Sequence, residues 1–313
     1  MSDLILSDPL PPLFDEISGG RFTVVPLHAA EKSDFAMAKG IVAYSHPTID
    51  GRLMDQCLAL KVISNHGVGV DHIDVAAASQ RSLPVGNTPG CLDASTADMT
   101  MALMLSVARN VVRGDHFARS SEFTHYDPAV LIGQEVTGST LGIIGMGRIG
   151  EQVAKRAMAF DMKVVYFNRN RRLDLESSLD VHYAPFADLL QNSDFVSLNC
   201  PLTSETTGLI GAAEFEMMKR SSILINMARG PVVQTDALYN ALRSGQIAAA
   251  GLDVTDPEPL PRDHPILALD NVIITPHLGS ASNNTRRRMM RMTVDNLVAG
   301  IEGRQLVAQV QPD

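Results

Sequence analysis

The chain has 313 residues, of which 45% are hydrophobic and 19% charged, and its formal net charge is −9. That length allows two domains, each with its own hydrophobic core. The acidic balance argues against general binding to nucleic acids or to anionic membranes, because both need a basic surface.

The N-terminal residues and the cysteines indicate the compartment. The segment Met1–Leu6 lacks the basic stretch and apolar core of a signal peptide, and no apolar run approaches the roughly 20 residues that cross a bilayer. The three cysteines, Cys57, Cys91 and Cys200, are odd in number and show no C-x-x-C spacing. We therefore expect a cytoplasmic protein with reduced, mostly buried thiols.

The first hundred residues alternate short apolar strands with helical stretches. Such an alternation predicts a parallel sheet that is covered on both faces. Helices are predicted over Asp71–Gln80 and over the alanine- and methionine-rich stretch Ala94–Arg113. The predicted strands are Leu4–Leu6, Phe22–Val25, Ile41–Tyr44, Val62–Ser64 and Val85–Asn87.

A second alternation follows the glycine-rich turn region Leu131–Gly138 and ends in a long helix from about Ser282 to Gly300. We therefore predict an α/β protein with two Rossmann- or flavodoxin-like lobes, each built on a parallel sheet, and an active-site cleft between them. Residues 1–97, completed by 286–313, are expected to form the substrate-binding lobe, and residues 98–285 the dinucleotide-binding lobe. The strands predicted in the second lobe are Leu141–Gly145, Lys163–Phe167, Asp194–Asn199, Ser222–Asn226, Ala248–Asp253 and Asn271–Thr275.

The segment Leu141–Gly150 consists of an apolar strand, a glycine turn and the first residues of an amphipathic helix. In this context a G-x-G-x-x-G pattern indicates dinucleotide binding. Gly145 allows the tight turn, Gly147 lets the backbone approach a pyrophosphate, and Gly150 lets the helix pack close to the strand. The free N–H groups and partial positive charge of the helix N-terminus would face the phosphates.

The next strand ends at Asn168, where an NAD site usually carries an Asp or Glu for the ribose hydroxyls. Arg169, Arg171 and Arg172 follow. A guanidinium can hold a 2′-phosphate through paired, charge-assisted hydrogen bonds, whereas a carboxylate would repel it. The alternative is that these arginines form only a solvated loop. We predict NADPH as the preferred cofactor, with NADH as the second possibility.

Three motifs follow strands of the second lobe, at the edge where open α/β sheets bind ligands. They are Asn226–Pro231, Gly251–Pro259 and Thr275–Ser280. An arginine, a glutamate and a histidine delivered by consecutive crossovers would converge on one crevice. No Cys or His spacing in the chain suits a metal.

Together with the glycine turn and the segments Asn65–Asp71 and Val85–Pro89, these motifs resemble the D-isomer-specific 2-hydroxyacid dehydrogenases. The resemblance covers nearly the whole chain. Within the family, the chain is most similar to NADPH-dependent glyoxylate/hydroxypyruvate reductases and to plant-type hydroxyphenylpyruvate reductases. The resemblance places the catalytic residues of the family at Arg229, Glu258 and His277.

The chemistry of reducing a 2-oxo acid suits these three residue types. Arg229 offers a permanent planar cation for the substrate carboxylate and the developing alkoxide. His277 can give the proton to the ketone oxygen, because an imidazole titrates near neutral pH. Glu258 would hydrogen-bond the other ring nitrogen and favour the imidazolium. Each also has a purely structural alternative: an ion-pair partner at a helix start, a loop carboxylate and a structural histidine, respectively.

The cofactor would contact further residues in the second lobe. The resemblance implies that Asp253 orients the nicotinamide carboxamide, although this residue could instead cap its loop, and that Cys200 and Pro201 contact the nicotinamide ribose and phosphates. The expected cofactor-binding residues are Gly145, Gly147, Arg148, Ile149, Gly150, Asn168, Arg169, Asn170, Arg171, Cys200, Pro201, Met227, Ala228, Asp253 and Gly279.

In the first lobe, Gly67-Val68-Gly69 would present backbone N–H groups to the substrate carboxylate. Val68 and Gly69 are therefore expected to bind substrate together with Arg229 and His277. The family often has an aromatic residue or Met where His66 stands, so His66 favours small, polar oxo acids, unless it is a surface or supporting residue. The role of Arg286, which matches an arginine of the family's last helix, stays open.

The leading interpretation is reduction of glyoxylate and hydroxypyruvate to D-2-hydroxy acids, with His277 as the general acid. Alternatives within the family are reductases of hydroxyphenylpyruvate or of 2-ketogluconate. A further alternative is a different oxidoreductase on the same scaffold, for example one that acts on phosphite or on a phosphorylated hydroxy acid. An alternative from another class is a dinucleotide-sensing binding protein, since a fold does not determine a function. The resemblance also implies a homodimer formed through the Ala94–Arg113 region.

Overall fold

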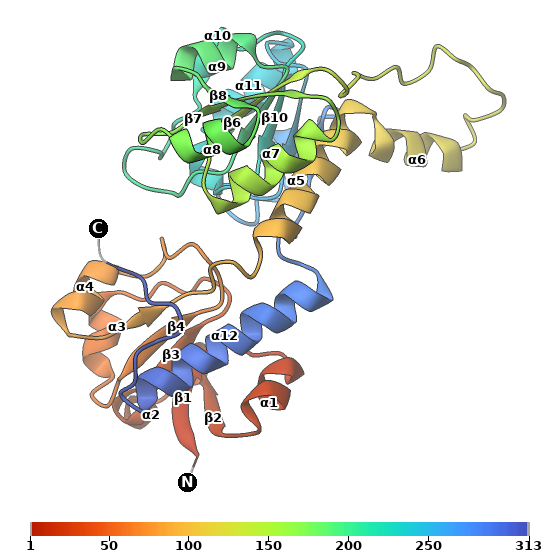
Figure 1. The fold of residues 1–313 in the computed structure, drawn as a ribbon. Coiled ribbons are helices and arrows are strands. Elements are labelled where there is room, and N and C mark those ends of the chain that lie inside the picture. Colours follow the sequence, from red (N-terminus) through yellow and green to blue (C-terminus); the bar gives the residue numbers. More distant parts are fainter. Residues whose placement is uncertain (1, 312–313) are drawn as a thin grey trace. The chain divides into compact units, whose positions relative to one another are not determined.

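The computed structural model describes residues 2–311, and the chain divides into two compact units (Figure 1). Unit 1 comprises Met1–Leu92 and Ser282–Asp313, and unit 2 comprises Asp93–Ala281. The boundaries predicted from the sequence lie at 97/98 and 285/286. In the described residues no helix combines the length and the apolar character that spanning a bilayer requires.

Unit 1 is built on a five-stranded sheet in which all neighbouring strands are parallel. The strand order β2-β1-β3-β4-β5 is that of flavodoxin-like doubly wound folds. The strands are β1 (Asp3–Ser7), β2 (Phe22–Pro26), β3 (Gly40–Ala43), β4 (Val62–Asn65) and β5 (Val85–Gly86). The helices are α1 (Pro12–Ser18), α2 (Lys32–Met37), α3 (Gly51–Gln56), α4 (Val75–Gln80) and α12 (Asn283–Ile301), with a short 3₁₀ turn at Leu27–Ala29.

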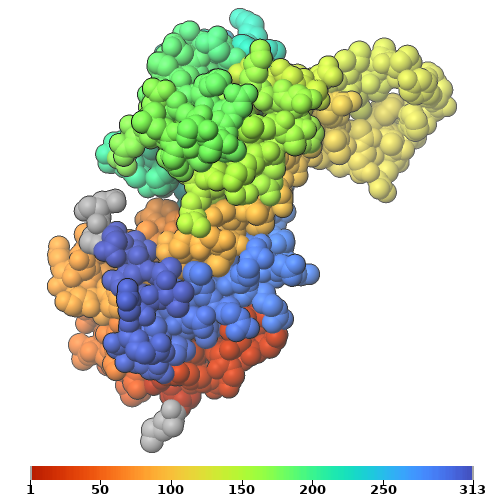
Figure 2. Space-filling view, in the orientation of Figure 1, coloured from red at the N-terminus to blue at the C-terminus, as the bar shows by residue number. Residues whose placement is uncertain are grey.

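Helix α12 comes from the end of the chain and packs on one face of the unit 1 sheet (Figure 1). Val294 and Leu297 of α12 pack with Ile5, Val42 and Val62 of the strands in one core cluster. A second cluster, containing the neighbouring strand residues Leu6, Ile41 and Ile63, fills the other face. The strands of a sheet covered on both faces are mostly apolar, and the central residues of these strands are. Figure 2 shows the C-terminal segment, in blue, against the red and orange residues of the same unit.

Unit 2 is built on a seven-stranded parallel sheet with the order β12-β11-β10-β9-β6-β7-β8. Counted along the unit, this is the Rossmann order 3-2-1-4-5-6 with a seventh strand added. The direction of winding reverses between β6 and β9, which is where such sheets bind their ligands. The strands are β6 (Thr140–Ile144), β7 (Lys163–Phe167), β8 (Val181–Tyr183), β9 (Phe195–Leu198), β10 (Ile223–Asn226), β11 (Ala249–Leu252) and β12 (Val272–Ile274). The two sheets confirm the predicted α/β class with Rossmann- and flavodoxin-like lobes.

Helices cover both faces of the unit 2 sheet and form two core clusters. On one side, α5 and α7 pack against each other and on the strands. The helices are α5 (Asp93–Ala108), α6 (Val111–Arg119), α7 (Arg148–Met158), α8 (Leu173–Ser178), α9 (Phe186–Asn192), α10 (Ala212–Met217) and α11 (Thr235–Ser244), with 3₁₀ turns at Gly230–Val232 and Pro265–Ala268.

Three predicted elements need correction. The helix expected over Asp71–Gln80 begins only at Val75, because the side chain of Asp74 caps it by accepting from the N–H of Ala77. The helix expected over Ala94–Arg113 is two helices, since Asn110 adopts a left-handed conformation with φ 52° between them. Strand β8 was missed because three residues at a sheet edge give no periodic pattern.

All three cysteines are buried, as predicted, and none of them forms a disulfide. Burial raises the pKa of the thiols of Cys57 and Cys200 to about 11. Both are therefore protonated and unreactive at neutral pH.

Candidate active site

The glycine turn connects β6 to α7 at the point where the winding of the unit 2 sheet reverses. Gly145 has φ +100°, and its N–H donates to the carbonyl of Phe167 at 3.1 Å. A Cβ at this position would lie 2.5 Å from the backbone nitrogen of Cys200, so conformation and space both require glycine. A Cβ at Gly150 would collide with the carbonyl oxygen of Gly145. The close approach of helix to strand thus depends on these two glycines.

The first turn of α7 fits a phosphate group. Gly147 is its N-cap residue, makes no side-chain cap hydrogen bond, and has open space where a Cβ would lie. An N-terminus of this kind presents unpaired N–H donors and the positive end of the helix dipole. The neighbouring Arg148 is bound through Nε to Asp93 at 2.9 Å, and Ile149 is half-buried. The turn therefore has the donors and the room that a pyrophosphate needs.

Asn168, at the end of β7, is tied to the glycine turn. Its Oδ1 accepts from the N–H of Met146 at 2.6 Å, and its Nδ2 donates to the carbonyl of the same residue at 3.4 Å. An ionised aspartate here would accept the first bond but could not donate the second. Asn168 thus supports the turn without placing a negative charge beside it.

The arginines of the following loop differ in how firmly they are paired. Arg171 makes two hydrogen bonds of 2.6 Å to Glu176 and lies over the ring of Tyr183. Arg172 binds Asp174 through two bonds of 2.8 and 2.7 Å. The side chain of Arg169 is 76% exposed, and its ion pair with Glu205 is 4.0 Å long. Arg169 is therefore the most available of the three cations.

Arg229 lies in the turn after β10, and a buried asparagine organises that turn. Asn226 is 1% exposed; its Oδ1 accepts from the N–H of Ala228 and its Nδ2 donates to the carbonyl of Arg229, both at 3.0 Å. The guanidinium of Arg229 donates through Nη1 to the carbonyl of Ala228 at 2.9 Å. The backbone of the turn is thereby fixed at the carboxyl end of its strand.

Gly230 brings this turn against the loop that follows β11. A Cβ at Gly230 would collide with the backbone carbonyl of Thr255, so only glycine allows the approach. The loop after β11 carries Glu258 between Pro257 and Pro259. The turn with Arg229 and the loop with Glu258 therefore pack on one another.

His277 and Glu258 meet directly. The ring nitrogen Nδ1 of His277 lies 2.8 Å from Oε1 of Glu258, and the two side chains are 31% and 40% exposed, respectively. Because an ionised carboxylate only accepts, Nδ1 is the donor of this hydrogen bond. His277 also has φ +55°, a left-handed conformation that is unusual for a residue with a side chain. The surroundings must hold it there.

Asp253, which is 2% exposed, provides that support. Its Oδ1 accepts from the hydroxyl of Thr275 at 2.6 Å and from the N–H of Leu278 at 2.7 Å, and its Oδ2 accepts from the N–H of Gly279 at 2.7 Å. Its carbonyl accepts from the N–H of His277 at 2.9 Å. These contacts correspond to the loop-capping alternative considered for Asp253.

The other residues expected to bind cofactor also follow strand ends of this sheet. Cys200 and Pro201 follow β9, and Met227 and Ala228 follow β10. A Cβ at Gly279 would lie 3.3 Å from the Cε atom of Met227, so the segments after β10 and β12 are in contact. Asn170 lies with Arg169 in the exposed loop after β7.

In unit 1, the segment with Val68 and Gly69 follows β4 at the carboxyl edge of that sheet. Both residues are half-buried. His66 is 5% exposed, so the surface alternative for this residue is wrong. Its ring packs on that of Tyr44 at a centroid distance of 5.0 Å, and its Nδ1 lies 3.1 Å from the hydroxyl oxygen of Thr293. His66 is thus a supporting residue beneath the 67–69 segment.

The family model of the D-isomer specific 2-hydroxyacid dehydrogenases, NAD binding domain, matches residues 101–279. The chain belongs to this family. Its second unit is accordingly a nicotinamide-dinucleotide-binding domain, and the protein is an oxidoreductase of 2-hydroxy acids and 2-oxo acids.

Individual relatives are similar to the chain over most of its length. A glyoxylate reductase of Korarchaeum cryptofilum is 46% identical over 252 residues, which is 80% of this chain and 76% of that protein. A crystal structure of a Thermus thermophilus protein has a TM-score of 0.89 at 43% identity and covers 99% of this chain and 100% of its own. An NADPH-dependent glyoxylate/hydroxypyruvate reductase of Sinorhizobium meliloti, in complex with NADP and malonate, has a TM-score of 0.90 at 30% identity over 99% of this chain and 97% of its own.

Several structuring residues were not predicted from the sequence. Asn226 is the first residue of the motif Asn226–Pro231. Its position directly after the apolar run Ile223–Ile225 could have identified it as a buried residue that forms a turn. The pairing of Arg171 with Glu176 had no such signal, because a glutamate five residues away on a polar stretch is common.

Proposed function

We propose that the protein reduces small 2-oxo acids, glyoxylate and hydroxypyruvate, to D-2-hydroxy acids with NADPH. The observation that supports this most directly is the 2.8 Å contact between His277 Nδ1 and Glu258 Oε1 in a loop that packs on the turn of Arg229. The names of the relatives, glyoxylate reductase and glyoxylate/hydroxypyruvate reductase, indicate the substrate class.

In this proposal, each of the three side chains has one task. The guanidinium of Arg229 binds the substrate carboxylate and stabilises the negative charge that develops on the ketone oxygen. His277 donates the proton on Nε2 to that oxygen as general acid. Glu258 accepts from Nδ1–H and fixes the plane of the imidazole. Backbone N–H groups of Val68 and Gly69 complete the binding of the carboxylate.

The dihydronicotinamide cofactor, when bound, supplies the hydride. Its pyrophosphate would lie against the N–H groups at the start of α7, above Gly145 and Gly147. Asp253 would act mainly by holding His277 in its left-handed conformation, and a contact with the carboxamide would be an additional role.

The preference for NADPH rests on the loop after β7. Asn168 brings no negative charge to the position where the ribose 2′-group is expected, and Arg169 is exposed with only a long ion pair. Arg171 can contribute to the 2′-phosphate only by giving up two short bonds to Glu176. Arg169 is therefore the proposed principal ligand of the 2′-phosphate.

We further propose a homodimer. Apolar side chains are exposed on α6 and on the segment that follows it, which project from the rest of unit 2 (Figure 1). Val111, Tyr126 and Ile132 are 53%, 81% and 76% exposed, respectively. A cluster of this kind is typical of a surface that a partner covers. The predicted interface region Ala94–Arg113 overlaps it only at its end.

Oxidation of NADPH in the presence of glyoxylate, hydroxypyruvate, hydroxyphenylpyruvate, 2-ketogluconate and a phosphorylated oxo acid tests the activity. We expect the highest kcat/KM with glyoxylate or hydroxypyruvate. A higher kcat/KM with an aryl or phosphorylated substrate would contradict the proposed substrate class and would favour one of the alternative activities. Dinucleotide binding without turnover of any substrate would favour the sensing function.

A His277→Gln variant tests the mechanism. We expect kcat to fall by about 10²- to 10⁴-fold, the contribution of one general acid, while the Kd for NADPH is unchanged. The control is His182→Gln, which changes an exposed histidine on β8. An unchanged kcat in His277→Gln would remove His277 from the reaction.

A further inference from the structure

Three carbonyl groups of the 67–69 segment in unit 1 are bound by asparagine side chains. Nδ2 of Asn65 donates to the carbonyls of Gly67 and Gly69 at 3.1 and 2.8 Å. Nδ2 of Asn87 donates to the carbonyl of Val68 at 3.0 Å. All three consecutive carbonyl oxygens therefore accept a hydrogen bond from an asparagine side chain.

This arrangement determines where the N–H groups point. In a trans peptide unit, the C=O of one residue and the N–H of the next point in opposite directions. With the carbonyls of residues 67–69 bound by the asparagines, the N–H groups of Val68, Gly69 and Val70 face away from them. These are three adjacent donors, and residues 68–70 are half-buried, so a carboxylate can reach them.

Asn87 is itself held from the far end of the chain. Nδ2 of Asn296, on α12, donates to the carbonyl of Asn87 at 3.0 Å, and Oδ1 of Asn296 accepts from the N–H of Ala308 at 3.1 Å. The N–H of Asn87 donates to the carbonyl of Ala308 at 3.3 Å. Asn296 is 0% exposed, so these bonds are not exchanged with water.

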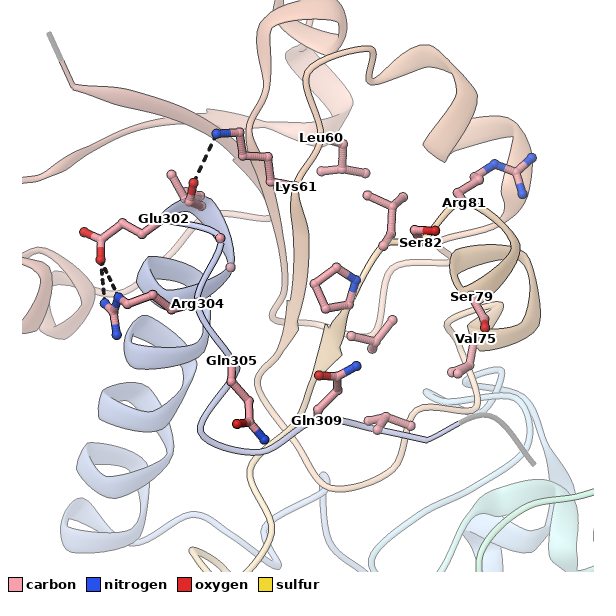
Figure 3. A pocket seen from close by; sticks show the side chains of 17 residues that line it. Leu60, Lys61, Val75, Ser79, Arg81, Ser82, Glu302, Arg304, Gln305 and Gln309 are labelled. Atoms are coloured by element: carbon pink, nitrogen blue, oxygen red, sulfur yellow. Dashed lines mark hydrogen bonds and ion pairs between the residues drawn. The ribbon is translucent and has the colours of Figure 1, made fainter.

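The C-terminal tail, residues 306–310, completes the contact by lying along the edge strand β5. Gln309 pairs antiparallel with Gly86 of β5, and the N–H of Val310 donates to the carbonyl of Val85 at 2.8 Å. The tail also borders a cavity of about 720 Å³, which Gln305 and Gln309 line together with Val85 of β5 (Figure 3). The pairing with β5 and the contact with Asn296 therefore fix the position of the tail at the edge of the cavity.

We propose that Asn65, Asn87 and Asn296 are positioning residues for the N–H groups of residues 68–70, which bind the substrate carboxylate. Asn65 orients this backbone directly, and the C-terminal tail orients it through Asn296 and Asn87. The inference rests on the proposed function for the identity of the ligand. None of the three asparagines touches the reacting atoms. Their effect is on substrate binding and not on the chemical step.

The test compares Asn296→Leu, Asn87→Leu and a chain that ends at Leu306 with the wild-type protein. Leucine keeps the approximate volume and removes the donor. We expect KM for glyoxylate and Ki for malonate, an unreactive carboxylate, to rise together by about five- to tenfold, the effect of losing one or two neutral hydrogen bonds. We expect kcat at saturation and the Kd for NADPH to change less than twofold, about the scatter expected of such measurements. The control is Gln305→Ala, which trims an exposed cavity-lining side chain outside the 306–310 segment.

A purely structural role would instead lower kcat through a smaller folded fraction and leave KM and Ki as they are. That result in all three variants would overturn the inference. Hydrogen exchange provides a readout that does not depend on activity: amides of residues 66–70 should exchange faster in the variants, while those of β1 should not. Wild-type protein that turns over no oxo acid would contradict the proposed function alone. Unchanged exchange at residues 66–70 would contradict the positioning role alone.

Discussion

The burial of His66 should make the stability of unit 1 depend on pH. Burial, the nearby cation of Arg286 on α12 and the adjacent ring of His46 lower the pKa of the His66 imidazole from 6.5 to about 4. The hydroxyl of Thr293 donates to the carbonyl of Met289, so it accepts from Nδ1–H of His66, and the ring is neutral.

Protons then bind the unfolded chain more readily than the folded one. Above pH 6.5 neither state carries the extra proton at His66, and stability is unaffected. As the pH falls from 6.5 to about 4, only the unfolded state is protonated there, so stability is lost. Below about pH 4 the loss levels off at about 3 kcal/mol, of which about 2 kcal/mol has been lost at pH 5.

A His66→Gln variant isolates this effect. At pH 8 the variant shows only the cost of lost packing against Tyr44 and Thr293, and this value serves as the internal reference. We expect the difference in opening free energy between wild type and variant to shrink by about 2 kcal/mol between pH 7.5 and pH 5. Hydrogen exchange of β3 and β4 peptides measures the opening of unit 1 specifically. A difference that stays constant over this pH range would refute the reasoning.

Two further predictions concern the cofactor and the assembly. Arg169→Ala should raise KM for NADPH by about tenfold or more while KM for NADH stays nearly constant, because an exposed charge-assisted contact to the 2′-phosphate is lost. Arg171→Ala should raise KM for NADPH less. Equal increases in KM for both cofactors in Arg169→Ala would contradict the assignment. Light scattering should give the molar mass of a dimer for the wild-type protein and a lower mass for the double variant Val111→Asp/Ile132→Asp. Both wild-type side chains are exposed in the single chain, so a charge there would disrupt a contact between two copies. A monomeric wild-type protein would exclude the proposed dimer.

The sequence predicted correctly those features that depend on neighbouring residues. The glycine turn was identifiable because an apolar strand, a residue that needs positive φ and a helical pattern follow one another within ten positions. The contact between Glu258 and His277 could be expected because their loops follow β11 and β12, and parallel strands bring their carboxyl ends to one edge of the sheet; the catalytic roles of these two residues and of Arg229 stay predictions. The absence of disulfides followed from the number and spacing of the cysteines.

The tertiary structure decided what depends on residues far apart in the chain. The order of the strands, the return of α12 to the first sheet and the burial of His66 beneath α12 come from packing between distant segments. The hydrogen bonds of Asn296 to Asn87 and Ala308 also join distant segments, and no local sequence pattern predicts them. The local sequence indicates which residues can form turns, make hydrogen bonds or be buried. The partner of each residue is determined only in the folded chain, because folding buries apolar surface and pairs the buried polar groups of distant segments.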